Sequence, residues 1–251
     1  MRLEKRWIVL LVAILHMTML AGCVAINKRA GSDDEIATAN VNLASEYFRK
    51  NQLNFAFESL KKALVYNPDS VEGNTLMGLV YERLEQPEKA NDHFEHAEGL
   101  VTKEQALYSY VHNVYGTFLC NRGQMKEAES HFTLAINNRL NQNPQAVMEN
   151  AGFCALQQQK FEKAESYFRD VLKLSPTTPG VLFKMAKLKF ETENYLSARA
   201  YVQRYHENNR DPESFALAIE IERVLNAESE AAKLIAQLKK TFPDSEQARA
   251  Y

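Results

Sequence analysis

The stretch that decides the fold is FEKAESYFRDVLKLSP, residues 161–176. In it Ala164 precedes Phe168 by four residues, a spacing that places both on one face of a helix, and the proline that follows at 176 ends a helix because it lacks an amide donor. Alanines followed four residues later by an aromatic or aliphatic residue recur at Ala56, Ala90, Ala128, Ala164, Ala198 and Ala232, with separations of 34, 38, 36, 34 and 34. Unrelated amphipathic helices would show a 3.6-residue period but no period of about 34 residues, so the chain contains an internal repeat.

The period resembles that of the tetratricopeptide repeat, a helix-turn-helix unit with a signature of Leu-Gly, Tyr, Ala-x₃-Phe and Pro. We number each repeat so that the alanine is position 20, and call its two helices A and B. The repeats then start near Ala37, Val71, Ser109, Gln145, Pro179 and Glu213. Position 8 is a small residue in the first five repeats, which lets helix A approach helix B closely. We therefore predict an all-α fold, a single right-handed α-solenoid of six tetratricopeptide repeats over residues 37–251, with longer turns near residues 102–107 and 140–143.

The N-terminus reads as an export signal, because three basic residues lie within MRLEKR and residues 7–19 are almost entirely apolar. That apolar run is too short to span a bilayer, which needs about 20 residues. It ends in Leu20-Ala21-Gly22-Cys23, which resembles the lipobox of bacterial lipoproteins. The resemblance implies that residues 1–22 are removed and that Cys23 carries acyl chains. The alternative is an ordinary signal peptide cut elsewhere, with a cysteine there by chance.

The residue after the lipidated cysteine also carries information in that family, since an aspartate there favours retention in the inner membrane. Here the position is Val24, so the resemblance points to the outer membrane, with the repeats of residues 37–251 on its periplasmic face. Residues 23–36 show no apolar periodicity and are expected to form a flexible linker of roughly 20 Å root-mean-square span.

Removal of the leader changes the charge balance. It takes away three basic residues and one acidic residue, so 30 − 3 = 27 basic and 32 − 1 = 31 acidic residues remain, a formal charge of −4. This balance argues against nucleic acid as a partner.

Two cysteines lie in the repeats. Cys120 and Cys154 are 34 residues apart, at positions 12 and 10 of helix A in repeats 3 and 4, and neighbouring A helices pack side by side. Export places them in an oxidising compartment, so we predict a disulfide between them. By closing a loop of about 34 residues, the bond would add about 3–4 kcal/mol of stability. The alternative is two buried free cysteines that act as small hydrophobic residues.

The sequence contains no set of residues that would make an enzyme. None of its glycines forms a nucleotide-binding loop, and His112, the nearest candidate base to Cys120, lies eight residues away on the same helix, about 12 Å along its axis. His93 and His96 are spaced for a metal, but two imidazoles alone make a poor site, and we expect them on a solvated face. We therefore predict no catalytic residue, metal, cofactor or small-molecule substrate.

The inner surface of the repeat array is the candidate binding surface, and in this repeat family helix A positions 2, 5, 9, 12 and 13 line it. Repeat 1 presents Val41, Phe48 and Arg49 there, and repeat 2 presents Leu79 and Arg83. An apolar strip edged by arginines suits an amphipathic or extended protein segment with acidic flanks. The alternatives are that Phe48 packs against the linker, and that the site lies at Phe183 and Phe190 in repeat 5.

A lipobox, a short linker, six repeats, a cysteine pair in repeats 3 and 4 and a length of 251 residues together resemble the PilW/PilF family of type IV pilus lipoproteins. The resemblance implies a pilotin, an outer-membrane lipoprotein that binds subunits of the pilus secretin and promotes their outer-membrane localisation and multimerisation. The alternative is a lipoprotein scaffold for envelope enzymes such as peptidoglycan hydrolases, or for the outer-membrane β-barrel assembly machinery.

Overall fold

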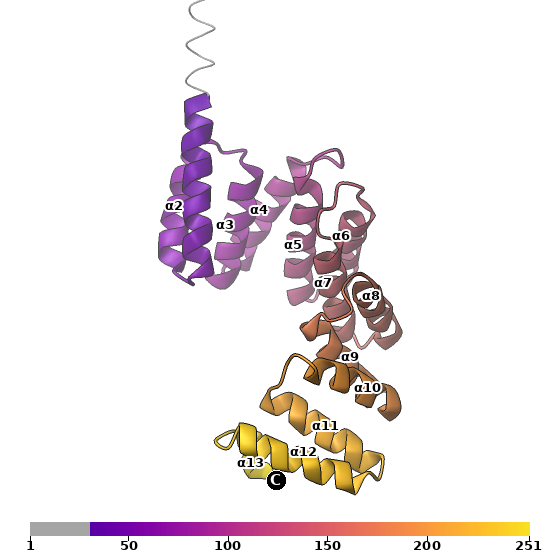
Figure 1. Cartoon of the computed structure of the whole chain (residues 1–251). Coiled ribbons are helices and arrows are strands. Elements are labelled where there is room, and N and C mark those ends of the chain that lie inside the picture. Colours follow the sequence, from indigo (N-terminus) through magenta and orange to yellow (C-terminus); the bar gives the residue numbers. More distant parts are fainter. Residues whose placement is uncertain (1–30) are drawn as a thin grey trace, which may run out of the picture. The chain divides into compact units, whose positions relative to one another are not determined.

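A computed structural model describes residues 31–251, which form helices and no strand (Figure 1). Residues 31–49 are helical and precede α2 (Leu53–Tyr66), α3 (Val71–Arg83), α4 (Pro87–Gly99), α5 (Leu107–Asn121), α6 (Met125–Asn137), α7 (Pro144–Gln157), α8 (Phe161–Leu174), α9 (Pro179–Glu191), α10 (Tyr195–His206), α11 (Pro212–Val224), α12 (Glu228–Thr241) and α13 (Glu246–Ala250). The described chain divides within α5 into two compact units, the first ending at Val114 and the second running from Tyr115 to Tyr251. The described residues contain no helix long and apolar enough to cross a membrane.

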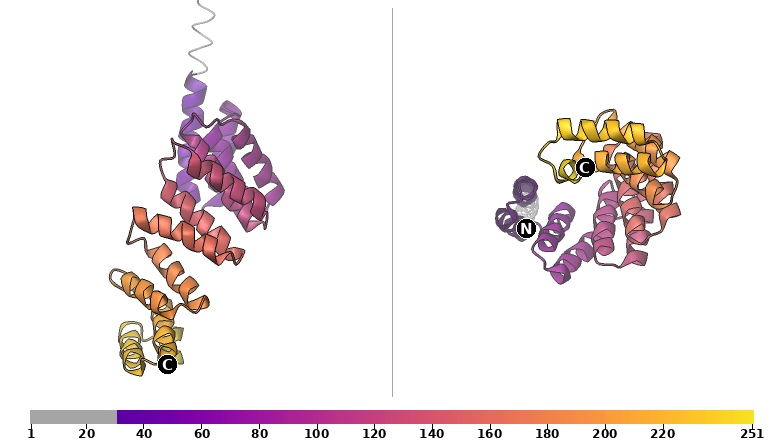
Figure 2. Two further views of the ribbon diagram at one scale, coloured as in Figure 1. Left: turned by 90° about the vertical axis from the view of Figure 1, so that its right-hand side faces the viewer. Right: turned by 90° about the horizontal axis from the view of Figure 1, so that it is seen from below.

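The fold is all-α, and its helices pair as the repeat signature predicts. In the first unit α3 packs against α4, and in the second unit α7 packs against α8, α9 against α10 and α11 against α12 (Figure 2). The A helices of repeats 2 to 6 begin at Val71, Leu107, Pro144, Pro179 and Pro212, within two residues of the predicted starts.

In two of these pairs, α3 with α4 and α7 with α8, a glycine at position 8 packs against a phenylalanine at position 24. The ring of Phe94 fills the space beside Gly78, where an added Cβ would lie 2.6 Å from a ring carbon, and Phe168 does the same beside Gly152 at 2.5 Å. Both phenylalanines are fully buried. The glycines are therefore needed for close helix approach and not for backbone flexibility.

The turn between helices A and B uses a left-handed residue at position 15 in every repeat. These residues are Asn51, Glu85, Gly123, Gln159, Glu193 and Asn226, with φ between 55° and 78°. Many helices end with a left-handed residue after their last turn, and glycine is the residue best suited to that conformation. Only one of the six residues is glycine, so this repeated left-handed turn is hard to predict from the sequence.

The sixth repeat is shifted by one residue from its predicted register. Ala231 is buried whereas Ala232 is exposed, so Ala231 occupies position 20 and the repeat starts at Pro212. In this register Asn226 falls on position 15, like the left-handed residues of the other repeats. Pro243 falls on position 32, like Pro68 in repeat 1 and Pro176 in repeat 4. The prediction was wrong by one residue because two adjacent alanines satisfy the same pattern.

The expected linker is shorter than predicted, because residues 31–36 are already helical. Two hydrogen bonds support this first turn of helix: Asn40 donates its side-chain amide to the carbonyl of Ile36 (2.8 Å), and Asn67, which caps the C-terminus of α2, donates to Asp34 (2.8 Å). The predicted signal sequence and Cys23 lie outside the described residues.

Candidate functional site

The inner surface of the first unit brings together three of the five residues predicted to bind a partner. Phe48 and Leu79 are half-buried and pack against the core of the first two repeats. The guanidinium carbon of Arg83 lies 5.3 Å from the centroid of the Phe48 ring, within range of a cation–π interaction. Phe48, Leu79 and Arg83 thus form one small surface, which we call the repeat 1–2 surface.

Val41 does not belong to this surface. Its side chain is 9% exposed and packs in the core of the first two repeats with Leu60 and Leu76. The prediction was wrong for this residue because repeat 2 covers position 5 of repeat 1, so that a side chain read as lining the inner surface contributes to stability instead.

Arg49 is also directed elsewhere. It forms an exposed ion pair with Glu46 on its own helix. Glu46 and Phe48 are two residues apart and so differ by about 200° around the helix axis. The guanidinium of Arg49 is therefore turned away from Phe48, and only one of the two predicted arginines edges the apolar strip.

Tyr110 of α5 adds an aromatic group to the inner surface of the first unit. Its side chain is 42% exposed. Partial desolvation and the nearby negative charge of Glu72 raise the pKa of Tyr110, which favours the neutral form of its hydroxyl. Its position 2 in repeat 3 is the signal by which the sequence marks it as an inner-surface residue.

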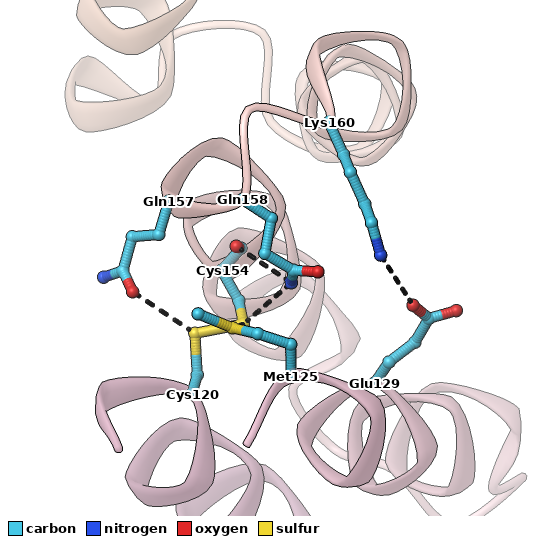
Figure 3. Close-up of a disulfide and its surroundings, with 7 residues drawn as sticks. All are labelled: Cys120, Met125, Glu129, Cys154, Gln157, Gln158 and Lys160. Carbon is cyan, nitrogen blue, oxygen red and sulfur yellow. Dashed lines mark hydrogen bonds and ion pairs between the residues drawn. A yellow bond between two sulfur atoms is a disulfide. The ribbon is translucent and has the colours of Figure 1, made fainter. Parts of the chain in front are cut away.

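Cys120 of α5 and Cys154 of α7 form a disulfide in the second unit, with Cα atoms 5.9 Å apart (Figure 3). Both residues are 4% exposed. Gln158 donates to the carbonyl of Cys154 (3.2 Å), and the sulfur of Met125 lies 3.8 Å from the Cys154 sulfur. The bond joins repeat 3 to repeat 4 in a site shielded from solvent.

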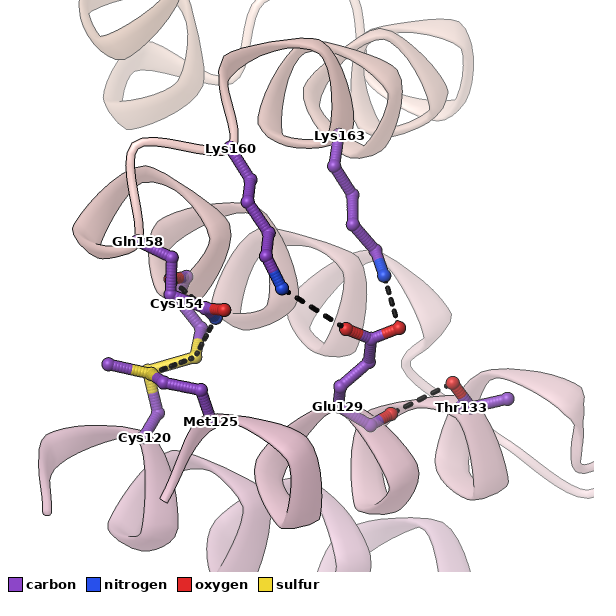
Figure 4. Close-up of polar contacts among 8 residues, drawn as sticks. All are labelled: Cys120, Met125, Glu129, Thr133, Cys154, Gln158, Lys160 and Lys163. Atoms are coloured by element: carbon purple, nitrogen blue, oxygen red, sulfur yellow. Dashed lines mark hydrogen bonds and ion pairs between the residues drawn. A yellow bond between two sulfur atoms is a disulfide. The ribbon is translucent and has the colours of Figure 1, made fainter. Parts of the chain in front are cut away.

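Polar contacts join the same two repeats beside the disulfide (Figure 4). Glu129 of α6 pairs with Lys163 of α8 and, at 3.9 Å, with Lys160 just before α8. The hydrogen bond from Lys163 holds the pKa of Glu129 below its usual value. These residues tie neighbouring B helices together and show no arrangement suited to catalysis.

The inner surface of the second unit carries the alternative aromatic pair. Phe183 is half-buried and packs against Tyr205, with ring centroids 5.4 Å apart. The Nζ atom of Lys187 lies 5.4 Å from the centroid of the Phe183 ring. Lys187 also pairs with Glu213 (2.7 Å). Phe190 packs edge-on against Tyr195, with centroids 5.5 Å apart. Both phenylalanines are thus engaged by neighbours within the fold.

The two histidines spaced for a metal each have their own partner. The Nδ1 atom of His93 lies 2.9 Å from the Oδ1 atom of Asn74, and the His93 ring stacks on Tyr81. His96 pairs with Asp69 at 3.1 Å. Burial, and to a smaller extent His96, lower the pKa of His93. The expectation of a solvated face was wrong for His93, which is half-buried within repeat 2.

Comparisons with known proteins agree with the repeat architecture. Residues 155–221 match the model of a tetratricopeptide repeat family. The chain is 27% identical over 232 residues to the type IV pilus assembly protein PilF of Pseudomonas aeruginosa, covering 90% of each chain.

Solved structures give the same result in three dimensions. The chain is similar to a structure of Pseudomonas aeruginosa PilF with a TM-score of 0.73 and 26% identity, covering 87% of this chain and 97% of that one. It is similar to PilW, described as a widely conserved type IV pilus biogenesis factor, with a TM-score of 0.76 and 25% identity, covering 86% and 97%.

Proposed function

We propose that this chain, a tetratricopeptide-repeat protein homologous to PilF and PilW, acts in type IV pilus biogenesis as a lipid-anchored pilotin. In this role acyl chains on Cys23 hold it at the periplasmic face of the outer membrane. The repeats bind subunits of the pilus secretin and promote their localisation and multimerisation there. The observation that carries the proposal is similarity to PilF over nine-tenths of both chains.

The repeat 1–2 surface is the part of the described chain best suited to hold the client. Phe48 supplies apolar area, Leu79 extends it, and Arg83 adds a positive charge at its edge. Aromatic and arginine side chains contribute most of the free energy in many protein interfaces. The mechanism is binding without catalysis, in which the anchor sets the location and the surface sets the client.

Secretin binding by the double variant Phe48→Ala, Leu79→Ala tests the proposal. If these residues are interface hot spots, the loss is about 2 kcal/mol, roughly 30-fold in dissociation constant. Phe183→Ala is the matched control, because it truncates a half-buried aromatic on the inner surface of the second unit. Circular dichroism and thermal melting establish that each variant is folded.

The possible results separate the site from the role. Wild-type binding by the folded double variant, with loss of binding by Phe183→Ala, would move the site to repeat 5. Secretin multimers that persist unchanged in the outer membrane of a deletion strain would overturn the pilotin role itself. Altered cell-wall turnover in that strain would then favour the envelope-enzyme scaffold.

A further inference from the structure

Three apolar side chains are exposed at the end of the first unit where the described chain begins. Val65 is 75% exposed, Tyr66 is 45% exposed and Ile36 is 38% exposed. The hydrogen bond from Asn67 to Asp34 (2.8 Å) holds the end of α2 beside the start of the first helix. Ile36 is two positions from Asp34, and Val65 and Tyr66 are two and one positions from Asn67. All three residues therefore lie within about one helical turn of this hydrogen bond.

Packing within the fold does not account for these residues. The face of α2 that is buried in the repeat core is formed by Ala56, Leu60 and Ala63. Val65 and Tyr66 lie in the last turn of α2, outside this buried face, and their side chains are exposed to solvent. Water contact with a largely exposed valine is unfavourable by up to about 2 kcal/mol relative to burial.

The position of the predicted lipid anchor indicates what covers this end. Helical structure is present from residue 31, and Cys23 lies 31 − 23 = 8 residues earlier. Eight residues span at most about 28 Å even when fully extended. The exposed apolar end is therefore the part of the described chain that is tied closest to the bilayer.

This end combines groups suited to a lipid surface with the exposed carboxylates of Asp34 and Glu35, which would stay in the water of the headgroup layer. Tyr66 combines an apolar ring with a polar hydroxyl, as do the tyrosines that gather at membrane interfaces. Lys62 is exposed and precedes Val65 by three residues and Tyr66 by four, so it lies on the same side of α2 as they do. Its long side chain can carry the ammonium group to lipid phosphates.

We infer that Ile36, Val65 and Tyr66 rest in the interfacial layer of the bilayer that holds Cys23, an inference that depends on the proposed lipid anchor. The contact would fix the orientation of the first unit and not merely its distance from the membrane. Phe48 is 12 residues beyond Ile36 on the same helix, about 18 Å along its axis. The repeat 1–2 surface would then be held at a set height above the lipid.

Tryptophan reporters in the acylated full-length protein test this contact. The only tryptophan, Trp7, lies in the leader, so the processed chain provides no background. Tyr66→Trp places a reporter at the proposed contact. Phe55→Trp is the matched control, since Phe55 is 60% exposed at the other end of α2, about 16 Å away along the axis.

Each protein is reconstituted into vesicles of phosphatidylethanolamine and phosphatidylglycerol whose acyl chains are brominated. We expect the Tyr66→Trp reporter to shift to shorter wavelength and lose emission, while Phe55→Trp keeps its emission. Adding Val65→Glu should reverse the loss at Tyr66→Trp, because it replaces the most exposed apolar side chain of the contact with a carboxylate.

Mass spectrometry of the N-terminal peptide separates the two ways of failing. Acyl groups on Cys23 with equal emission from both reporters would overturn the membrane contact and leave the anchor standing. Absence of acyl groups would overturn the anchor and this inference together. A Tyr66→Trp signal that changes with added secretin but not with brominated lipid would assign the end to the client instead.

Discussion

Removal of the disulfide should destabilise the second unit while leaving the proposed client surface intact. The perturbation is the double variant Cys120→Ala, Cys154→Ala, which breaks the bond and leaves no unpaired thiol at either site. Both cysteines lie in the second unit, whereas the repeat 1–2 surface lies entirely in the first. Stability and secretin binding should therefore respond differently.

The magnitude follows from the loop that the bond closes. A sequence separation of 34 residues corresponds to about 4 kcal/mol of stability on the chain-entropy estimate. For a unit of this size each kcal/mol moves the melting temperature by roughly 2–4 °C, so the expected decrease is roughly 10 °C. Loss of two buried sulfur atoms adds a smaller packing contribution.

The assay is thermal unfolding followed by circular dichroism, with and without a reducing agent. Reduced wild-type protein is the control, because it lacks the cross-link but keeps both side chains. Its melting temperature should fall close to that of the double variant, whose own melting temperature should not respond to reductant. Secretin binding measured below the transition should equal that of wild type.

Two results would refute this reasoning. Alkylation of both cysteines in unreduced, denatured protein, located by peptide mass, would show that the bond is not formed. A double variant as stable as the oxidised wild type would show that the cross-link contributes nothing to holding repeats 3 and 4 together.

Three further predictions concern the repeats themselves. Gly152→Ala should lower the free energy of unfolding by about 1–3 kcal/mol, since its Cβ would meet the Phe168 ring at 2.5 Å, and chemical denaturation will show whether the packing is this tight. Glu193→Gly should be neutral or raise stability by up to about 1 kcal/mol, because φ of 57° favours glycine, and a clear loss in the same assay would contradict it. Burial and the hydrogen bond to Asp211 raise the pKa of Tyr205 to about 12, which favours its neutral form in the fold. The stability that this provides is fully present below pH 10 and decreases as pH rises from 10 to about 12. A denaturation series should show a shallower alkaline decrease for Tyr205→Phe.

The sequence by itself determined the fold class and nearly all of the repeat register. The reason is that helix pairing in this fold depends on residues at fixed spacing, such as Gly152 against Phe168, whose small and large volumes are visible in the sequence. It also placed Cys120 and Cys154 near each other, because equivalent positions of adjacent repeats are neighbours in space.

Only the tertiary structure decided which side chains remain available to a partner. Val41 and Leu79 both belong to positions expected on the inner surface, yet Val41 is buried by repeat 2 while Leu79 stays half-exposed. The direction of Arg49 was set by Glu46, a competing partner on the same helix. Exposure depends on what the neighbouring helix places against a residue and on which ion pair forms, and neither follows from the spacing of residues along one repeat.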